Sequence, residues 1–267
     1  MWYVWDFLFW KGVTGLKTIA ITNQKGGVAK TTTSWSVGVG LHKKGNKVLL
    51  VDLDAQTNLS FTAKVDLLNL EHTLYDCFNG KAKIKDCIIT IDSGLDIIVG
   101  GIDLASADRD FNKLGRERML KKALEPISND YDFCIIDTPP TLGVLNENAL
   151  TVSDSIIIPM QAEIYALQGI NQLYGFIEDI REISNPGLQI EGILITRVNE
   201  NTNLYKDMRT QFENVAERMG TKVYKTFIHS TVAVGEVALQ RSNLFDEMPN
   251  ATATKDYKAF IEELLQD

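Results

Sequence analysis

Short apolar runs alternate with amphipathic segments along most of the chain. The apolar runs have the length of buried strands, and the segments between them carry apolar residues at helical spacing. This pattern predicts strands at residues 18–22, 47–52, 95–99, 132–136, 154–158 and 190–195. It predicts helices at residues 31–44, 116–125, 143–152, 166–183, 203–219 and 253–265. The alternation favours an α/β fold: a single-domain, doubly wound, mostly parallel sheet flanked by helices.

The turn after the first predicted strand has the composition of a phosphate-binding loop. Residues 18–22 lead into Lys25-Gly26-Gly27-Val28-Ala29-Lys30-Thr31-Thr32, which opens a predicted helix. Backbone N–H groups of such a turn point at an anion, and the helix N-terminus adds partial positive charge. Lys30 can then reach the terminal phosphates, and the Thr31 hydroxyl can bind Mg²⁺. The segment therefore predicts a nucleotide site, with an ordinary surface turn as the alternative.

This loop departs from the common P-loop pattern G-x-x-x-x-G-K-[ST]. Gln24 and Ala29 occupy the two glycine positions, and a second lysine, Lys25, precedes the glycine pair. Alanine has less backbone freedom than glycine, so Ala29 bears on the conformation of the loop but not on the placement of the lysines.

Carboxylates follow two later strands. One apolar run ends in Asp52-Leu53-Asp54-Ala55-Gln56, and another ends in Asp137-Thr138-Pro139-Pro140. The ligand crevice of an open parallel sheet lies beyond the C-terminal ends of its strands, so both should approach the phosphate loop. We expect Asp137 to order Mg²⁺, because phosphate binding requires a metal partner. For Asp52, metal binding and a structural role as turn former or helix cap both stay open.

With these motifs the chain resembles the ParA/MinD family of deviant Walker A ATPases, and especially its short ParA-type partition proteins. The resemblance rests on four runs in the family's order, residues 25–32, 52–56, 137–140 and 158–163, followed by Tyr165-Ala166-Leu167. Together they span most of residues 17–200, whereas the C-terminal third matches more loosely.

The resemblance implies a role for each matching residue. Lys25 would be the signature lysine that crosses a dimer interface to the partner's phosphates, and Lys30 the phosphate lysine of its own subunit. Thr31 would supply the Mg²⁺ hydroxyl, Asp54 would position or activate the attacking water, and Asp137 would hold Mg²⁺ through water. Phosphoryl transfer depends on placed positive charge, an in-line water and a metal, which agrees with these roles.

The overall charge limits how the chain could contact DNA. The 267 residues carry a formal net charge of −8, so binding to nucleic acid would require a local basic patch. The resemblance implies ATP-bound dimers that bind double-stranded DNA non-specifically through basic residues of the C-terminal half. The candidate patch consists of Lys206, Arg209, Arg218, Lys222, Lys225 and Arg241. Acidic residues interleave with it, so a solvated helix face is the alternative.

Two domain assignments follow. Residues 17–267 form the ParA-type ATPase domain, and residues 1–16 form an aromatic N-terminal extension outside the core. The extension begins with a ten-residue apolar run, which is too short to span a bilayer and lacks the features of a secretory signal. Disorder, interfacial anchoring and a packing contact stay open for it. The residues printed before residue 17 are too few for a helix-turn-helix domain, so we do not expect operator-specific DNA binding.

The cysteines do not indicate a metal cluster. Cys77, Cys87 and Cys134 lack CxxC spacing, and Cys134 lies within a predicted strand, where a buried structural thiol is expected. Thiols without a disulfide framework are typical of a reducing cytoplasm.

The leading hypothesis is an ATP-dependent DNA-segregation ATPase that uses ATP and Mg²⁺. Its ATP-bound sandwich homodimer would bind DNA in the nucleoid, and a ParB-like centromere-binding partner would stimulate its weak hydrolysis and its release. One alternative is a MinD-like membrane-cycling ATPase, but the C-terminal residues 255–267 carry more acid than base and suit docking on the domain. Another is an ATP-switch accessory in replication, conjugation or transcription control.

Overall fold

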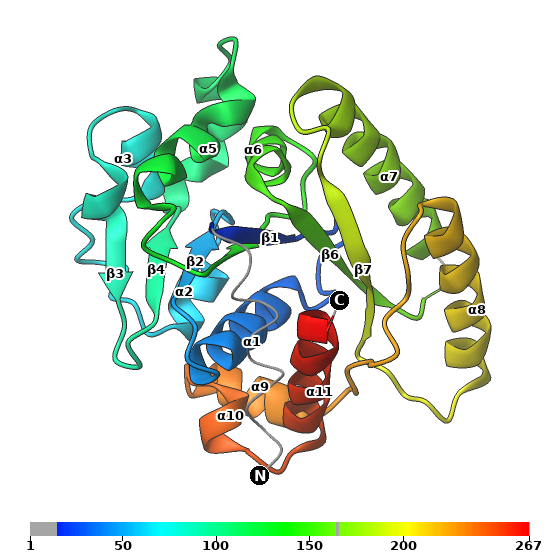
Figure 1. The fold of residues 1–267 in the computed structure, drawn as a ribbon. Coiled ribbons are helices and arrows are strands. Elements are labelled where there is room, and N and C mark those ends of the chain that lie inside the picture. The colour runs from blue at the N-terminus through cyan, green and yellow to red at the C-terminus, as the bar shows by residue number, and fades with distance from the viewer. Residues whose placement is uncertain (1–14, 164–165, 267) are drawn as a thin grey trace.

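A single seven-stranded sheet runs through the protein, as seen in a computed structural model that describes residues 15–163 and 166–266 (Figure 1). The strand order is β3-β4-β2-β5-β1-β6-β7. The strands are β1 (Lys17–Ile21), β2 (Val48–Asp52), β3 (Ile88–Thr90), β4 (Asp96–Val99), β5 (Phe133–Asp137), β6 (Ser155–Gln161) and β7 (Gln189–Thr196). Neighbouring strands are parallel except β3 and β4, which are antiparallel. The predicted α/β fold with a mostly parallel sheet is therefore confirmed.

The longer helices agree with the sequence pattern. They are α1 (Lys30–Lys43), α6 (Val144–Val152), α7 (Ala166–Ile183), α8 (Asn203–Arg218) and α11 (Thr252–Gln266). The helix predicted at residues 116–125 is divided, because α5 (Met119–Leu124) is preceded by a 3₁₀ turn, η5 (Arg116–Arg118), and followed by another, η6 (Glu125–Ile127).

Several short elements were not predicted. They are α2 (Asn58–Thr62), α3 (Leu74–Phe78), α4 (Ala107–Asp110), α9 (Val232–Leu239), α10 (Leu244–Glu247) and the 3₁₀ turns η3 (Ile84–Cys87) and η4 (Ile102–Ser106). Such elements are too short for an apolar period to stand out. Local caps stabilise two of them: the Thr73 and Asp76 side chains form a capping box at α3, and Asn243 accepts from the Asp246 N–H at α10.

Each face of the sheet has its own apolar core. Helices α1, α2 and α9 to α11 cover one face, and α5 to α8 cover the other (Figure 1). Ile135 and Ile136 of β5 are both fully buried, but they belong to opposite cores because successive side chains of a strand point to opposite faces. Burial on both faces explains why the strands read as continuous apolar runs.

Helix α1 lies close to its neighbours because it carries glycines. A Cβ atom at Gly38 would lie 2.5 Å from Cδ2 of Leu50, and one at Gly40 would overlap the Ile261 side chain of α11. The helix is thereby held against β2 on one side and α11 on the other. Since α1 begins at the phosphate loop, this packing also fixes the loop relative to the strand ends.

Gly192 of β7 also lies against a close neighbour, and this contact with Tyr224 can be tested. A Cβ atom there would lie 2.7 Å from the buried ring of Tyr224, so Gly192→Ala should lower the free energy of unfolding by about 1–3 kcal/mol through overpacking. Gly175→Ala in α7 is the matched control, because its Cβ would meet nothing within 4 Å and alanine favours helix. Urea unfolding measures both variants. Equal stabilities would contradict the close contact between β7 and Tyr224.

Candidate functional site

Three strand ends meet at the site, as the sequence predicts. The strands β2, β5 and β1 are neighbours, and Asp137 at the end of β5 pairs in register with Asp52 of β2 and Ile21 of β1. The phosphate loop follows β1 directly. The loop and the two acidic strand ends therefore lie side by side at the C-terminal ends of the parallel strands.

The loop has an open, left-handed backbone. Gly27 has φ +77°, and Ala29 has φ 66° and ψ 31° just before α1. This conformation favours glycine and costs an alanine about 1–2 kcal/mol. Cβ atoms built at Gly26 and Gly27 would meet nothing within 4 Å, so this side of the loop has room for an anion.

Lys30 lies inside the loop. Its side chain is buried, and its Nζ donates to the backbone carbonyl of Lys25 at 3.1 Å. Burial lowers the pKa of Lys30, while the carboxylates of Asp137 and Asp54 act in the opposite direction. A phosphate group in the loop would supply further negative charge next to this buried ammonium.

Asp137 holds two hydroxyls of α1. The Thr31 hydroxyl donates to its Oδ2 at 2.7 Å, and the Ser34 hydroxyl donates to its Oδ1 at 2.9 Å. The carboxyl is fully buried, and burial followed by repulsion from Asp52 raises its pKa to about 7. The predicted pair of Thr31 and Asp137 is thus brought together. Ser34 was not predicted, although its spacing of three residues from Thr31 puts both hydroxyls on one helix face.

Asp52 is bonded to the segment that follows it. Its carboxylate accepts from the Ser60 N–H at 2.9 Å, the Ser60 hydroxyl at 2.6 Å and the Asp54 N–H at 3.2 Å. Burial raises its pKa to about 6, although the bonds from Ser60 act against this rise. These contacts fit the structural role left open for Asp52, and its metal role stays a prediction.

Asp54 lies two residues beyond Asp52, after the end of β2. It is half-buried, its Oδ1 accepts from the Gln56 N–H at 3.0 Å, and its charge acts on Lys30. A half-buried carboxylate beside the phosphate lysine can orient a water molecule. Its catalytic role stays a prediction.

Lys25 lies at the rim of the loop. Its side chain forms an ion pair with Glu163 just after β6, and the two side chains are 35% and 48% exposed. Its ammonium therefore points to a surface that a second molecule can reach, whereas the Lys30 ammonium is buried in the loop.

Three polar residues at the ends of β6 and β7 support the loop, and of these the sequence analysis includes only Gln161, within the run 158–163. Gln161 Nε2 donates to the Gly27 carbonyl at 2.7 Å, and the Thr196 hydroxyl donates to the Val28 carbonyl at 3.0 Å. Arg197 Nη1 reaches the Gly27 carbonyl at 3.4 Å. For Thr196 and Arg197, which the sequence analysis missed, the only sequence signal is a polar residue at the end of an apolar strand.

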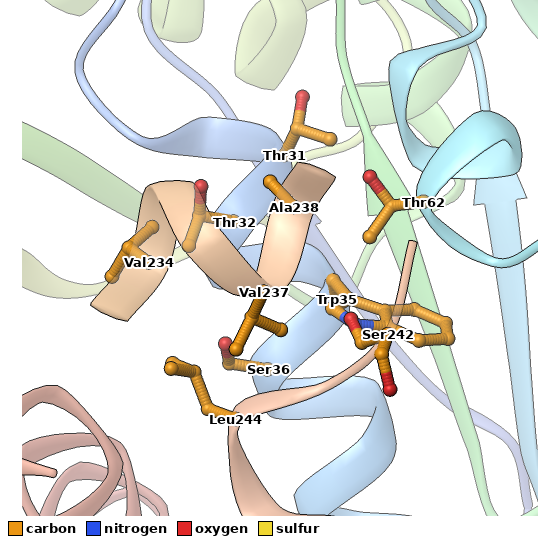
Figure 2. A pocket seen from close by; sticks show the side chains of 10 residues that line it. All are labelled: Thr31, Thr32, Trp35, Ser36, Thr62, Val234, Val237, Ala238, Ser242 and Leu244. Atoms are coloured by element: carbon orange, nitrogen blue, oxygen red, sulfur yellow. The ribbon is translucent and has the colours of Figure 1, made fainter. Parts of the chain in front are cut away.

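A small cavity lies beside the loop, between the first turns of α1 and the helix α9 (Figure 2). Its volume is about 50 Å³, far below the roughly 300 Å³ of a typical ligand pocket. Trp35 closes one wall by donating from Nε1 to the Ser242 carbonyl at 3.0 Å. The cavity is lined by Thr31, Thr32, Trp35, Ser36, Thr62, Val234, Val237, Ala238, Ser242 and Leu244. It is too small to be the nucleotide site itself.

The six basic candidates for DNA contact do not form one group. Arg241 donates to the carbonyls of Phe61 and Val65 at 2.7 Å and 3.0 Å, so it belongs to the α2 side of the molecule. Arg209 on α8 is bonded to Glu213 at 3.0 Å. The others are Lys206 and Arg218 on α8, with Lys222 and Lys225 in the segment after it. DNA binding by these residues stays a prediction.

Further sequence predictions concern the ends and the thiols. The aromatic run at the N-terminus lies outside the described residues.

The C-terminal helix α11 docks on the domain as expected, because it buries Phe260, Ile261 and Leu264 in the core. Cys134 is fully buried, which is also as expected. In residues 15–163 and 166–266, none of the helices combines the length and apolar character needed to cross a membrane.

Known sequences match most of the chain. Residues 16–190 match the family model AAA_31, described as an AAA domain. The sporulation initiation inhibitor protein Soj of Bacillus subtilis is 43% identical over 222 residues, which cover 82% of this chain and 87% of Soj. The chromosome partitioning protein ParA of Caulobacter vibrioides is 36% identical over 225 residues, 83% of each chain.

Solved structures are similar over nearly the whole chain. A Mycobacterium smegmatis protein named cobyrinic acid a,c-diamide synthase, with a bound ATP analog and magnesium, is 34% identical with a TM-score of 0.82, covering 94% of this chain and 95% of that one. A putative plasmid partition protein of Borrelia burgdorferi bound to AMPPNP is 28% identical with a TM-score of 0.77, covering 94% and 99%. With its deviant phosphate loop and the acidic ends of β2 and β5, the chain belongs to the ParA/MinD family of P-loop ATPases.

Proposed function

We propose that this protein is an ATP-dependent partition ATPase that acts as a nucleotide-controlled dimer. The observation that carries the proposal is the arrangement of Lys30, Thr31 and Asp137 around an open phosphate loop. The identity to Soj and ParA supports a role in partition. The relatives solved with an ATP analog or AMPPNP support ATP as the nucleotide, and one of them also holds magnesium.

The described residues fit this nucleotide and its metal. Lys30 binds the terminal phosphates from inside the loop, and the loop's backbone N–H groups bind the others. The Thr31 hydroxyl and Asp137 hold Mg²⁺, which usually keeps several waters and needs few protein ligands. Bound there, Mg²⁺ would neutralise charge on the phosphates, and Asp54 would orient the attacking water.

Lys25 makes this activity depend on a second subunit. Its ammonium lies at the rim and not in its own loop, so it is available to a phosphate held by a facing copy. The ATP-bound homodimer then binds double-stranded DNA in the nucleoid, and a ParB-like partner stimulates hydrolysis and release. Partition is favoured over MinD-like membrane cycling because the apolar face of α11 is used for docking.

The test is nucleotide-dependent dimerisation and DNA retention. With a slowly hydrolysed ATP analog and Mg²⁺, the wild-type chain should sediment as a dimer and stay on non-specific double-stranded DNA, with retention falling as salt rises. Lys25→Ala should bind the analog but stay monomeric, because it lacks the cation that reaches the other subunit. Lys44→Ala, at the far end of α1, is the matched control and should behave as wild type. Equal DNA retention with ATP and ADP would refute the proposal.

A further inference from the structure

The end of β6 and the residues that follow it, as far as α7, contact the exposed half of the phosphate loop. Gln161 Nε2 donates to the Gly27 carbonyl at 2.7 Å, and Glu163 forms the ion pair with Lys25. From the loop, Gln24 Nε2 donates to the Gly169 carbonyl of α7 at 2.7 Å. The conformation of the loop around Lys25 is therefore coupled to residues more than a hundred positions away in the chain.

The backbone and the side chain of Lys25 are held separately. Its N–H donates to Asn23 Oδ1 at 3.0 Å, and its carbonyl accepts from Lys30 Nζ at 3.1 Å, so its backbone is fixed at the phosphate site. Its ammonium is held by Glu163 of the same chain. The proposed role of Lys25 requires that ammonium to bind phosphate in a second copy, which it cannot do while it remains paired with Glu163.

We propose that Glu163 is a positioning residue that keeps Lys25 in its own subunit until the triphosphate of a second copy displaces the carboxylate. The inference rests on the proposed function, because it assumes that Lys25 acts across a dimer. Glu163 thus opposes dimerisation in the absence of nucleotide and raises the protein concentration at which the ATP-bound dimer forms.

The expected effect follows from the exposure of the pair. Exposed ion pairs shift an equilibrium by up to about fivefold. A two-fold symmetric dimer breaks two such pairs, so the effect on its dissociation constant is up to about 25-fold.

The test is Glu163→Gln, which keeps the size and polarity of the side chain but removes its charge. With a slowly hydrolysed ATP analog and Mg²⁺, the dimer dissociation constant from analytical ultracentrifugation should fall by more than twofold and up to about 25-fold. Analog binding to the monomer should stay as in the wild type, because Glu163 pairs only with Lys25 among the described residues. Glu178→Gln, which removes an exposed carboxylate paired with Arg181 on α7, is the matched control.

A second measurement uses the nucleotide-free chain. The rate of Lys25 acetylation, followed by mass spectrometry, should rise in Glu163→Gln, and the rate at Lys44 should stay constant. A change in the dimer constant of less than twofold, a weaker dimer, or an unchanged Lys25 rate would overturn the inference. If the wild type itself fails to bind nucleotide or to dimerise, the proposed function fails, whereas the acetylation rate still reports on the ion pair.

Discussion

Lys30→Ala is expected to reduce ATP hydrolysis by at least about 100-fold, the usual cost of removing a charge-stabilising group from an active site. The Lys30 ammonium is buried inside the loop and lies near the carboxylates of Asp137 and Asp54. Two other cations lie at the loop, but the Lys25 ammonium is paired with Glu163 at the rim and Arg197 donates to the Gly27 carbonyl, so neither replaces the buried charge of Lys30. Phosphate release and the binding of a fluorescent ATP analog measure the loss.

Lys44→Ala is the matched control for Lys30→Ala. It removes a lysine just beyond the opposite end of α1, where the side chain lies 3.8 Å from Glu262 at the surface, so hydrolysis should change by less than about twofold. Circular dichroism should confirm that both variants are folded. Hydrolysis by a folded Lys30→Ala protein within threefold of wild type would refute the placement of the phosphates at this loop.

The parts of the site that the sequence predicts are those encoded by adjacent residues. The loop of residues 25–32 and Asp137 follow strands that can be recognised, and a parallel sheet brings strand ends together whatever the connections between them. The pairing of Lys25 with Glu163 could not be predicted in the same way. It spans 138 positions and depends on the path of the chain after β6.

Asp52 illustrates a different limit. The sequence leaves its role open, and the contacts that fix its orientation come from Ser60 in the five-residue helix α2, which carries no periodic signal. The three-residue strand β3 was missed for a related reason, because it lies at the edge of the sheet and its residues are only partly buried. Long, doubly buried elements can be read from the sequence, whereas short ones are specified by caps and tertiary contacts.

The buried carboxyl of Asp137 gives the second large expected effect, a loss of stability as pH rises. Its pKa is raised from 3.8 to about 7, so the native chain holds a proton that the unfolded chain releases. Between about pH 4 and 7 the native state therefore binds more protons, and the free energy of unfolding falls as pH rises through this window. At about 1.4 kcal/mol per pKa unit, this carboxyl alone can lower the free energy of unfolding by up to about 4 kcal/mol by pH 7.5. Asp52, with a pKa of about 6, acts in the same direction.

Asp137→Asn should separate the pH-dependent loss of stability from the role of the carboxylate in hydrolysis. The amide has nearly the shape of a protonated carboxyl, can bond with the hydroxyls of Thr31 and Ser34, and stays neutral at all pH values. In urea unfolding without nucleotide, the free energy of unfolding of the variant should decline much less between pH 5 and 7.5 than that of wild type. The variant should also be more stable than wild type at pH 7.5. Its Mg²⁺-dependent hydrolysis should fall, because the charge that holds the metal is gone.

The exposed Asp130→Asn variant is the control for Asp137→Asn and should keep the wild-type pH profile, because Asp130 pairs only with Lys85 at the surface among the described residues. A wild-type stability that rises from pH 5 to 7.5, or an Asp137→Asn profile parallel to wild type, would contradict a protonated Asp137 in the nucleotide-free protein. The expected result would mean that the nucleotide-free site is destabilised by the same carboxylate that its metal requires. Mg²⁺ and nucleotide would then stabilise the fold by favouring the ionised form of Asp137.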